Sequence, residues 1–514
     1  MNPDLLARSL QEFLAEARSG VVIEDGQVIF DLDSARYSIS SERGRCLLHF
    51  WSEERNVVRE VLDKDAELKQ GVLVLSVRRF AKARPHQLEI CRDRDRRPPA
   101  AKKAGRSRYA RQLERVLRRE APDWALDKAG LATSMDLEHS FSPVYARGLV
   151  RKGRSSFAVL GVNQQETQSA VDAALTFGLL WLDACREREA GRSVVEGLRL
   201  FLPQGSSATL QIRLAHLNHS AAKFQLVELE ERDESFTDID YSDQGNINTR
   251  LVRCPDQAQA RARLASAVSK VQNFVPNAEI AVLSATEIAF RLHGLEFARA
   301  RSASLPGSFQ LMDEIVFGVA GFSAVLTEEN EAVFAEFVRT VIEARDLHGN
   351  RRDPVWRMYP ERWLESLVVK DVSAIDARLD SAHVYSQVPA FSASDRAMID
   401  VLTCTRDARL AVLELKADED IHLPLQGLDY WARVNWHQQR GEFQQYGYFR
   451  GLQLSPRPPL LFLVAPSLRV HPALDTVLRY YSPEIDWSLI GVDERWREQM
   501  KVVFRKTKLR AAVG

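Results

Sequence analysis

The sequence predicts a multidomain protein of mixed α/β and α+β class. With 514 residues, the chain is too long for one ordinary core, because single cores stop growing at about 250 to 300 residues. Apolar residues make up 45% of the chain, which supplies hydrophobic surface for several cores. In the last third, segments with strand and helix patterns alternate, as in a central mixed sheet flanked by helices.

Composition limits the environment and the partners of the chain. The 70 basic and 70 acidic residues balance, so any nucleic-acid contact must come from local basic patches. The 5 cysteines form no CxxC pair, which argues against a disulfide framework or a zinc cluster. The longest apolar run, Ala173–Leu182, is too short for a membrane span, and the N-terminus does not resemble a signal peptide. We expect a cytoplasmic protein without membrane contact.

Residues 1–91 predict a small α+β module that begins with an amphipathic helix, Leu5–Ala17. Segments with strand patterns follow, and the charged segment Glu53–Leu62 between them is typical of a helix. Residues 92–105 are charged, contain Pro98-Pro99 and lack periodicity, which predicts a basic linker.

Residues 106–222 alternate between strand and helix patterns, which predicts an α/β domain. The expected elements are helix Tyr109–Leu117, strands His139–Val150 and Ser155–Val162, helix Ala170–Arg186 and strand Gly197–Pro203.

Residues 223–352 predict a connecting α+β domain. Its expected elements are helix Pro255–Asn273, strand Glu279–Leu283, a helix to His293 opened by the capping box Ser284–Glu287, and helix Thr327–Arg345. Three basic residues, Arg291, Arg299 and Arg301, lie close in sequence here. Substrate contact and ion pairing with a partner both explain them.

Residues 353–514 predict a mixed sheet flanked by helices. The expected helices are Arg362–Val369, Leu425–Gln439, Pro472–Tyr481 and Glu494–Met500. The expected strands are Val384–Pro389, Ala397–Cys404, Arg409–Leu415, Leu460–Ala465, Trp487–Val492 and Lys501–Phe504.

The strand Arg409–Leu415 is apolar on both faces, as a central buried strand is, yet it leads into Glu414-Leu415-Lys416. Strand side chains alternate, so Glu414 and Lys416 point the same way, and Asp400 on the neighbouring strand can face them. Buried charges cost several kcal/mol each unless they are compensated. A divalent cation such as Mg²⁺, which prefers carboxylate oxygens, would compensate the two acids.

The following helix carries Gln426 and Tyr430 four residues apart, so both side chains project from one face. Asp400, Glu414-x-Lys416 and Gln426-x-x-x-Tyr430 together resemble the PD-(D/E)XK nuclease superfamily, which has a restriction-endonuclease-like fold. Ile399 stands where the proline of the motif's name would be.

The resemblance implies metal-dependent hydrolysis of phosphodiester bonds in DNA, with RNA as an open alternative. Asp400, Glu414 and the Leu415 carbonyl would hold Mg²⁺, or Mn²⁺ in its place. Lys416 would assist the attacking water, and Gln426 and Tyr430 would support the site. Families of this type often add a glutamate from the preceding helix. Glu365 is the matching candidate, and Glu361 is the alternative.

Other interpretations of these residues remain open. Glu414 and Lys416 would also suit a structural ion pair at a strand end. The protein would then be a non-catalytic nucleic-acid-binding or scaffold protein, and a homo-oligomer or a protein partner is compatible with either function. The same tripeptide occurs at Glu67-Leu68-Lys69 in a polar stretch, where we expect a solvated helix face or turn.

The domain at 106–222 repeats features of the C-terminal one. AVLGV (Ala158–Val162) echoes AVLEL (Ala411–Leu415), and GLRLFLP (Gly197–Pro203) echoes PLLFLVAP (Pro459–Pro466). Gly161 then stands in place of Glu414, Asn163 in place of Lys416 and Phe177 in place of Tyr430. We predict a degenerate nuclease-like copy without metal ligands; ordinary α/β periodicity is the alternative explanation.

Overall fold

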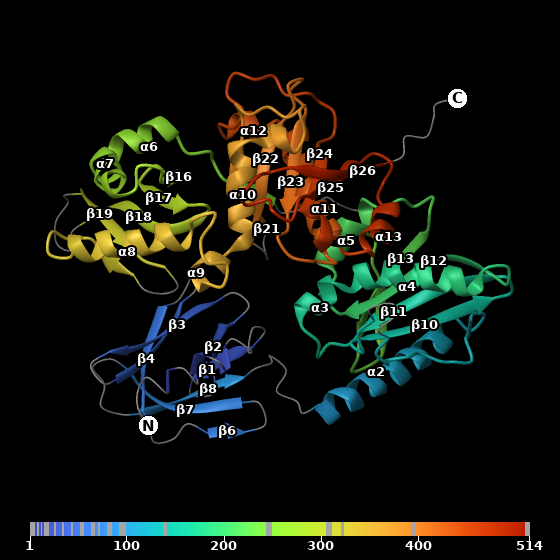
Figure 1. The fold of residues 1–514 in the computed structure, drawn as a ribbon. Coiled ribbons are helices and arrows are strands. Elements are labelled where there is room, and N and C mark those ends of the chain that lie inside the picture. Colours follow the sequence, from blue (N-terminus) through green and yellow to red (C-terminus); the bar gives the residue numbers. More distant parts are fainter. Residues whose placement is uncertain are drawn as a thin grey trace. The chain divides into compact units, whose positions relative to one another are not determined.

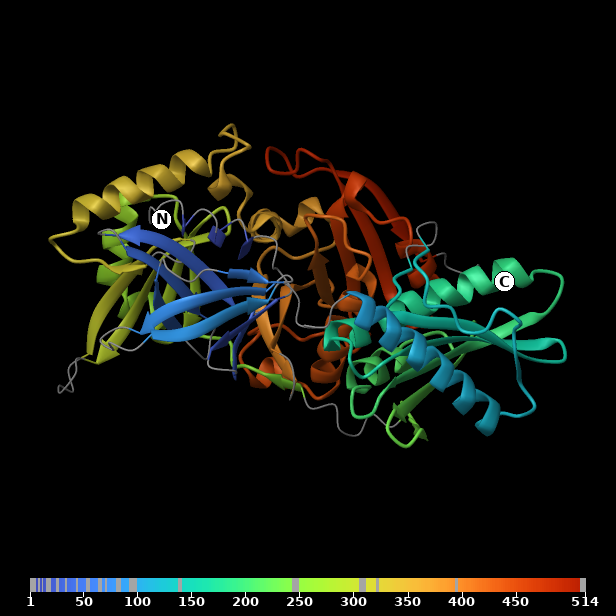
Figure 2. The same ribbon diagram turned by 90° about the horizontal axis from the view of Figure 1, so that it is seen from below.

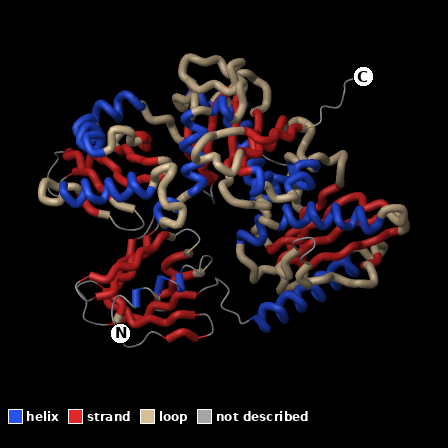
Figure 3. The backbone as a smooth tube through the Cα atoms, in the orientation of Figure 1, coloured by secondary structure: helices blue, strands red, loops and turns tan. Residues whose placement is uncertain are grey.

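The structure, a computed structural model, divides the chain into two compact units. It describes residues 6–508 except 8–9, 12, 15–19, 25–26, 33–34, 43–44, 52–55, 63–66, 70–71, 80–84, 92–98, 137–140, 243–248, 305–310, 320–322 and 393–395. One unit comprises Met1–Gly105 with Val316–Asn330, and the other Arg106–Ile315 with Glu331–Gly514. Several sheets with flanking helices confirm a mixed α/β multidomain protein (Figure 3). No helix in the described ranges is long and apolar enough to cross a membrane.

The smaller unit contains an antiparallel sheet in the order β2-β1-β8-β7-β5-β4-β3, with β6 paired to β7. Its strands are β1 (Val21–Glu24), β2 (Gln27–Asp31), β3 (Arg36–Glu42), β4 (Arg45–Trp51), β5 (Asn56–Val61), β6 (Glu67–Lys69), β7 (Val72–Arg79) and β8 (Pro85–Cys91). The residues described between 6 and 14 are helical, and this helix buries Leu6, Leu10, Phe13 and Leu14 in the core.

Two expectations for this part of the chain are wrong. The expected helix Glu53–Leu62 contains strand β5, whose β-branched Val57, Val58 and Val61 suit a strand. The expected turn or helix face at Glu67-Leu68-Lys69 is strand β6. In the expected linker, residues 92–98 lie outside the described residues, and helix α2 (Pro99–Glu120) occupies the rest.

The larger unit begins with a six-stranded sheet in the order β14-β13-β12-β11-β10-β9. Its elements are β9 (Ala125–Leu126), β10 (Tyr145–Lys152), β11 (Ser155–Val162), α3 (Gln168–Asp172), α4 (Ala174–Glu189), β12 (Val194–Pro203), α5 (Ala208–Ala215), β13 (Lys223–Glu230) and β14 (Ser235–Asp238). Helices α2 and α4 cover opposite faces (Figures 1 and 2). The sheet thus extends past residue 222, where the sequence placed its end.

The connecting region forms a five-stranded sheet in the order β16-β17-β18-β19-β20. Its elements are α6 (Gln257–Arg263), α7 (Ala265–Phe274), β16 (Glu279–Ser284), β17 (Glu287–Leu292), β18 (Leu295–Ser304), β19 (Leu311–Phe317), β20 (Ala324–Val325), α8 (Glu331–Ala344) and α9 (Pro354–Arg357). The helix expected from Ser284 to His293 is wrong, since β17 lies there. The Ser284 hydroxyl accepts the Thr286 N–H at 3.2 Å and closes a turn instead of capping a helix.

The C-terminal sheet has seven strands in the order β15-β21-β22-β23-β24-β25-β26. Its elements are β15 (Thr249–Leu251), α10 (Pro360–Lys370), η1 (Val372–Ala374), β21 (Tyr385–Ser392), β22 (Arg396–Cys404), β23 (Leu410–Leu415), α11 (Leu423–Gln439), α12 (Glu442–Gln445), β24 (Leu460–Pro466), η2 (Ser467–Arg469), α13 (Leu474–Arg479), β25 (Asp486–Val492) and β26 (Val502–Thr507). Helix α10 packs on one face and α11 on the other. The helix expected at Glu494–Met500 is wrong, because turns occupy that segment.

The six-stranded sheet and strands β21 to β26 of the C-terminal sheet have the same connectivity. In each, two antiparallel pairings are followed by two parallel ones and a final antiparallel one, so β9 to β14 correspond to β21 to β26, and β15 is an additional edge strand. A glycine lies at matching places in α4 and α11. A Cβ on Gly178 would lie 2.8 Å from Leu198, and one on Gly427 would lie 2.4 Å from Leu463. This match aligns Phe177 with Gln426, not with Tyr430 as the sequence comparison suggested.

The two sheets share one hydrophobic core, to which α4 and α11 both contribute. Their contact is reciprocal: α5 packs on α11, and its counterpart α13 packs on α4. Arg213 of α5 donates to Asp429 of α11 at 2.9 and 2.8 Å, and Arg479 of α13 donates to Asp183 of α4 at 2.8 Å. A bridge between Leu217 and Tyr481 joins the segments after α5 and α13. Reciprocal contacts of this kind are typical of two-fold-related subunits.

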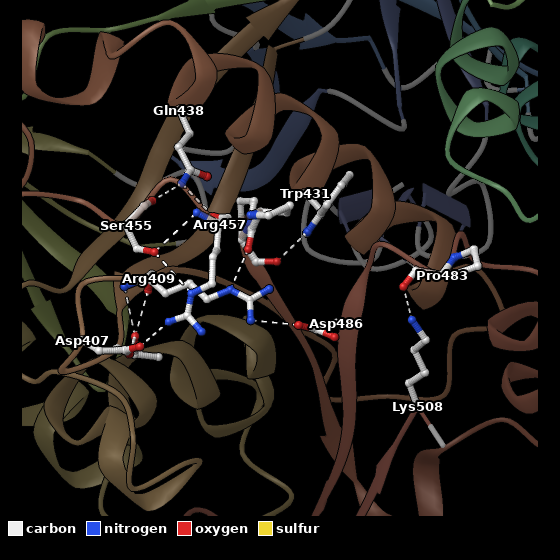
Figure 4. A network of polar contacts seen from close by, with 12 residues as sticks. Asp407, Arg409, Trp431, Gln438, Ser455, Arg457, Pro483, Asp486 and Lys508 are labelled. Atoms are coloured by element: carbon white, nitrogen blue, oxygen red, sulfur yellow. Dashed lines mark hydrogen bonds and ion pairs between the residues drawn. The ribbon is translucent and has the colours of Figure 1, made fainter. Parts of the chain in front are cut away.

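A polar network fixes the ends of β23 and β24 farthest from the acidic residues (Figure 4). Arg409, at the start of β23, donates to the Pro458 carbonyl at 2.7 Å and pairs with Asp486 at 2.8 Å. The indole of Trp431 on α11 donates to the Pro459 carbonyl at 2.8 Å. These contacts hold α11 against the sheet and thereby set the position of its first turns.

We predict that Arg213→Ala lowers the free energy of unfolding of the larger unit by about 3 kcal/mol, because it leaves Asp429 without its partner in a largely buried interface. Urea denaturation would measure the loss. The control Arg339→Ala removes an exposed ion pair on α8, for which a loss below about 1 kcal/mol is expected. Equal losses in both variants would contradict the prediction.

Candidate functional site

Asp400 and Glu414 lie on adjacent strands at one edge of the C-terminal sheet. Val401 of β22 pairs with Leu413 of β23, and Asp400 and Glu414 are the adjoining residues of the two strands toward this edge. The Leu415 N–H donates to Asp400 Oδ2 at 3.0 Å. The structure therefore brings together the two carboxylates and the residue whose carbonyl was expected to be the third ligand.

Glu414 is the most deeply buried acid of the site, with a side chain only 2% exposed. Its Oε1 lies 3.2 Å from Lys416 Nζ, and its Oε2 has no hydrogen-bond donor among the described residues. Burial, with the charge of Asp400, raises the pKa of Glu414 well above its usual range. Burial also opposes the charge of Lys416, but the surrounding acids, Glu414 first, raise the pKa of its ammonium.

Helix α10 brings both candidate glutamates to this edge. Glu365 is buried and accepts a hydrogen bond from Arg362 at 3.0 Å, and burial raises its pKa to about 7. Glu361, one turn earlier, is half exposed and lies 3.9 Å from Lys416. The two alternatives thus occupy different places: Glu365 lies on the Asp400 side, and Glu361 lies beside the lysine.

Gln387 on β21 is a site residue that the sequence did not indicate. Its amide donates to Glu365 Oε2 at 2.8 Å and to Asp400 Oδ1 at 3.3 Å. Its φ is 51°, in the left-handed region that disfavours a side chain. The pairing of β21 with β22 passes from Ser386 to Val388 and leaves Gln387 without a partner residue on β22. Strained residues of this kind cluster at functional sites, but a glutamine carries no sequence signal for the conformation.

Gln426 and Tyr430 lie on α11, which passes over the site. A Cβ on Gly427 would lie 3.6 Å from the Glu414 Cβ, so this turn of the helix covers the acid. Burial, with the charges of Glu414 and Asp400, raises the pKa of Tyr430. Gln426 Oε1 is buried without a donor among the described residues. Neither side chain hydrogen-bonds Lys416, so the expected support of the lysine is not a direct hydrogen bond in this conformation.

The residues present fit a hard divalent cation. Glu414 Oε2 is a buried carboxylate oxygen without a donor, which in a native protein calls for an ion or a water, and Asp400 lies opposite it. Within the described ranges, one set of three His, Cys, Asp or Glu groups has ligand atoms within 4.8 Å of one another: Asp380, His383 and Cys404. Burial raises the pKa of Cys404 to about 12, so that thiol is protonated and is a poor ligand.

The first sheet does not repeat this arrangement of acids. Ala146 of β10 pairs with Gly161 of β11, the residue that the sequence comparison set in place of Glu414. Gly161 faces α2, whose Tyr109 and Leu113 fill the space beside it, whereas Glu414 lies under Gly427 of α11. The face of β11 that α4 covers buries the apolar residues Ala158, Leu160 and Val162. The match of α4 with α11 therefore puts one of these apolar residues, not Gly161, at the place of Glu414. Asn163, which the comparison set in place of Lys416, donates to Glu166 at 3.3 Å.

No protein-family model matches the chain, and no curated protein matches it.

We predict that the protein becomes less stable as pH rises in metal-free buffer. The raised pKa of Glu365 means that the folded chain keeps a proton that the unfolded chain has lost, so its contribution to stability is complete below about pH 4.5 and disappears as pH rises through about 7. The loss between about pH 5 and pH 8 is roughly 2 to 3 kcal/mol for this group. In urea denaturation, Glu365→Gln should remove this pH-dependent loss of stability, whereas Glu343→Gln on the exposed face of α8 should retain it. An unchanged pH slope in Glu365→Gln would contradict the prediction.

We predict that Gln387→Gly is more stable than Gln387→Ala by about 1 kcal/mol, because alanine retains the left-handed strain that glycine relieves. Both variants lose the amide that bridges Glu365 and Asp400, so the difference between their free energies of unfolding reports the backbone strain. Urea denaturation of the pair measures it. Equal stabilities would mean that the backbone at this position is not strained.

Proposed function

We propose that the chain is a metal-dependent nuclease that hydrolyses phosphodiester bonds of DNA, with its active site at Asp400, Glu414 and Lys416. The observation that supports this most is the unpartnered Glu414 Oε2, buried beside a second carboxylate and a lysine. A purely structural Glu414–Lys416 pair would use one carboxylate oxygen and would not need Asp400 opposite it. Burying further acids beside such a pair costs free energy, and a bound cation would offset that cost.

Asp400 and Glu414 would hold the cation, Mg²⁺ or Mn²⁺, together with the Leu415 carbonyl. When bound, such an ion polarises the phosphate and activates a water. Lys416, which lies 3.2 Å from Glu414, would orient the attacking water and neutralise charge that develops on the phosphate. Glu365, with its pKa raised to about 7, would exchange a proton near neutral pH.

The connectivity of the C-terminal sheet, with α10 before it and α11 after β23, is compatible with a restriction-endonuclease-like domain. The matching connectivity of the first sheet supports a duplication, and the apolar residues that β11 buries on its α4 face, where β23 carries Glu414 under α11, support a copy that lost its acids. The first copy would then contribute packing, through the shared core, and not hydrolysis.

The alternative function is a non-catalytic nucleic-acid-binding or scaffold protein. The ion pair between Lys416 and Glu414 is the contact that this alternative requires. It does not account for the clustering of Asp400, Glu361 and Glu365 around that pair, so we favour the nuclease.

We predict that Glu414→Ala and Lys416→Ala each abolish Mg²⁺-dependent degradation of DNA, because each removes a group that contacts the cation or the attacking water. Cleavage of plasmid, of linear duplex and of single-stranded DNA, with and without EDTA, measures the loss, and thermal melting checks folding. The matched control is Lys69→Ala in the other Glu-Leu-Lys tripeptide, which should cleave like the wild type. Cleavage that survives in both site variants would refute the proposal.

A further inference from the structure

A pocket of about 520 Å³ lies between the connecting sheet and the C-terminal sheet of the larger unit. Residues of β16 and β17 line it on one side, and residues of α10 and β21 line it on the other. Glu365 and Gln387 belong both to this lining and to the acidic cluster. The pocket therefore borders the site proposed for catalysis.

The charged groups of the lining leave an excess of positive charge. Lys370 pairs with Glu279 at 2.9 Å, and Arg362 pairs with Glu365 at 3.0 Å. Arg253 and Arg291 also line the pocket, and neither forms a hydrogen bond or ion pair with a residue that the structure describes. The charges of Glu296, Glu365 and Glu279 act on Arg291, but no described carboxylate forms an ion pair with either guanidinium group. Because the lining holds more basic than acidic side chains, the pocket is suited to an anion.

Arg291 differs in this respect from the other two arginines of its sequence cluster. Arg299 donates to Glu296 at 2.7 Å and to Glu287 at 2.9 Å, and Arg301 donates to Glu314 at 2.7 Å. Arg291 is half-buried, and burial lowers its pKa. A partly desolvated guanidinium without an acceptor gains most from a ligand that supplies one.

The β17–β18 turn fixes Arg291 beside α10. A Cβ on Gly294 would lie 2.0 Å from the Arg362 carbonyl oxygen. The turn therefore lies so close to α10 that only glycine fits at this position. The ring of His293 stacks on Trp363 of α10 at 5.1 Å, and Arg345 donates to the His293 carbonyl at 2.8 Å. The arginine is thus held in place by packed elements and not by a mobile loop.

We propose that this pocket binds a backbone phosphate of single-stranded nucleic acid, with Arg291 as its main contact and Arg253 as the second. Planar guanidinium groups bind phosphate through paired hydrogen bonds. A pocket of this volume is in the range of small-ligand sites, so it admits one or two nucleotides of a strand and excludes a duplex. The proposal rests on the nuclease function, because the pocket would hold the strand that Asp400 and Glu414 would cut.

The test is the affinity for a short fluorescein-labelled single-stranded DNA, measured by fluorescence anisotropy in EDTA at several salt concentrations. Arg291→Ala should raise the Kd roughly tenfold and make the dependence of log Kd on log salt shallower by about one phosphate contact. Arg291→Lys should restore part of the affinity. The matched control Arg301→Ala, on the next strand and outside the pocket lining, should bind like the wild type, and thermal melting should show all variants folded.

Three results would overturn the proposal: an unchanged Kd in Arg291→Ala, a duplex whose binding depends equally on Arg291, or inorganic phosphate that competes as strongly as the oligonucleotide. The last result would identify a site for small phosphate compounds.

Failure of this proposal is distinguishable from failure of the nuclease. If the wild type cleaves nothing but Arg291→Ala still weakens binding, the pocket is supported and the nuclease is not. If Glu414→Ala abolishes cleavage while Arg291→Ala leaves Kd and KM unchanged, the nuclease is supported and the pocket is overturned.

Discussion

The electrostatic repulsion among buried acids is the constraint on which the C-terminal domain depends. Asp400, Glu414 and Glu365 are held close to one another, out of water and with little positive charge besides Lys416 and Arg362. The fold keeps them there through strand register, through α10, and through the approach of α11 over Glu414. Such an arrangement costs stability unless protons or a cation are present. The strained backbone of Gln387 adds to that cost, which is compatible with a site that is completed by binding.

Much of the core of this site could be predicted from the sequence, because its residues lie on strands with clear apolar patterns. Alternation along β23 put Glu414 and Lys416 on one side, and the neighbouring hairpin strand brought Asp400 opposite. The same tripeptide at Glu67 shows why the pattern around it matters more than the motif. What the sequence could not supply is the contribution of β21, because the left-handed backbone of Gln387 depends on tertiary packing.

Two of the three wrong helices have a common cause. Glu53–Leu62 was expected from its charged composition and Ser284–His293 from a capping box, yet both hold strands whose apolar residues pair with neighbours distant in sequence or across a turn. The periodicity of a short segment carries no information about those pairings. The same limit applies to Arg291, Arg299 and Arg301. Their spacing left substrate contact and ion pairing equally open, and only the positions of Glu287, Glu296 and Glu314 separate Arg291 from the other two.

The shared core beneath α4 and α11 has a consequence for how this protein can be divided. The helix that covers the candidate site packs its apolar residues, Leu428 and Trp431 among them, into a core completed by the first sheet, and His216 lies against the Trp431 ring at 5.3 Å. The C-terminal domain therefore cannot be excised without loss. Separated from the first sheet, it would expose the apolar face of α11 to water, so we expect the C-terminal domain to need the first sheet in order to fold stably.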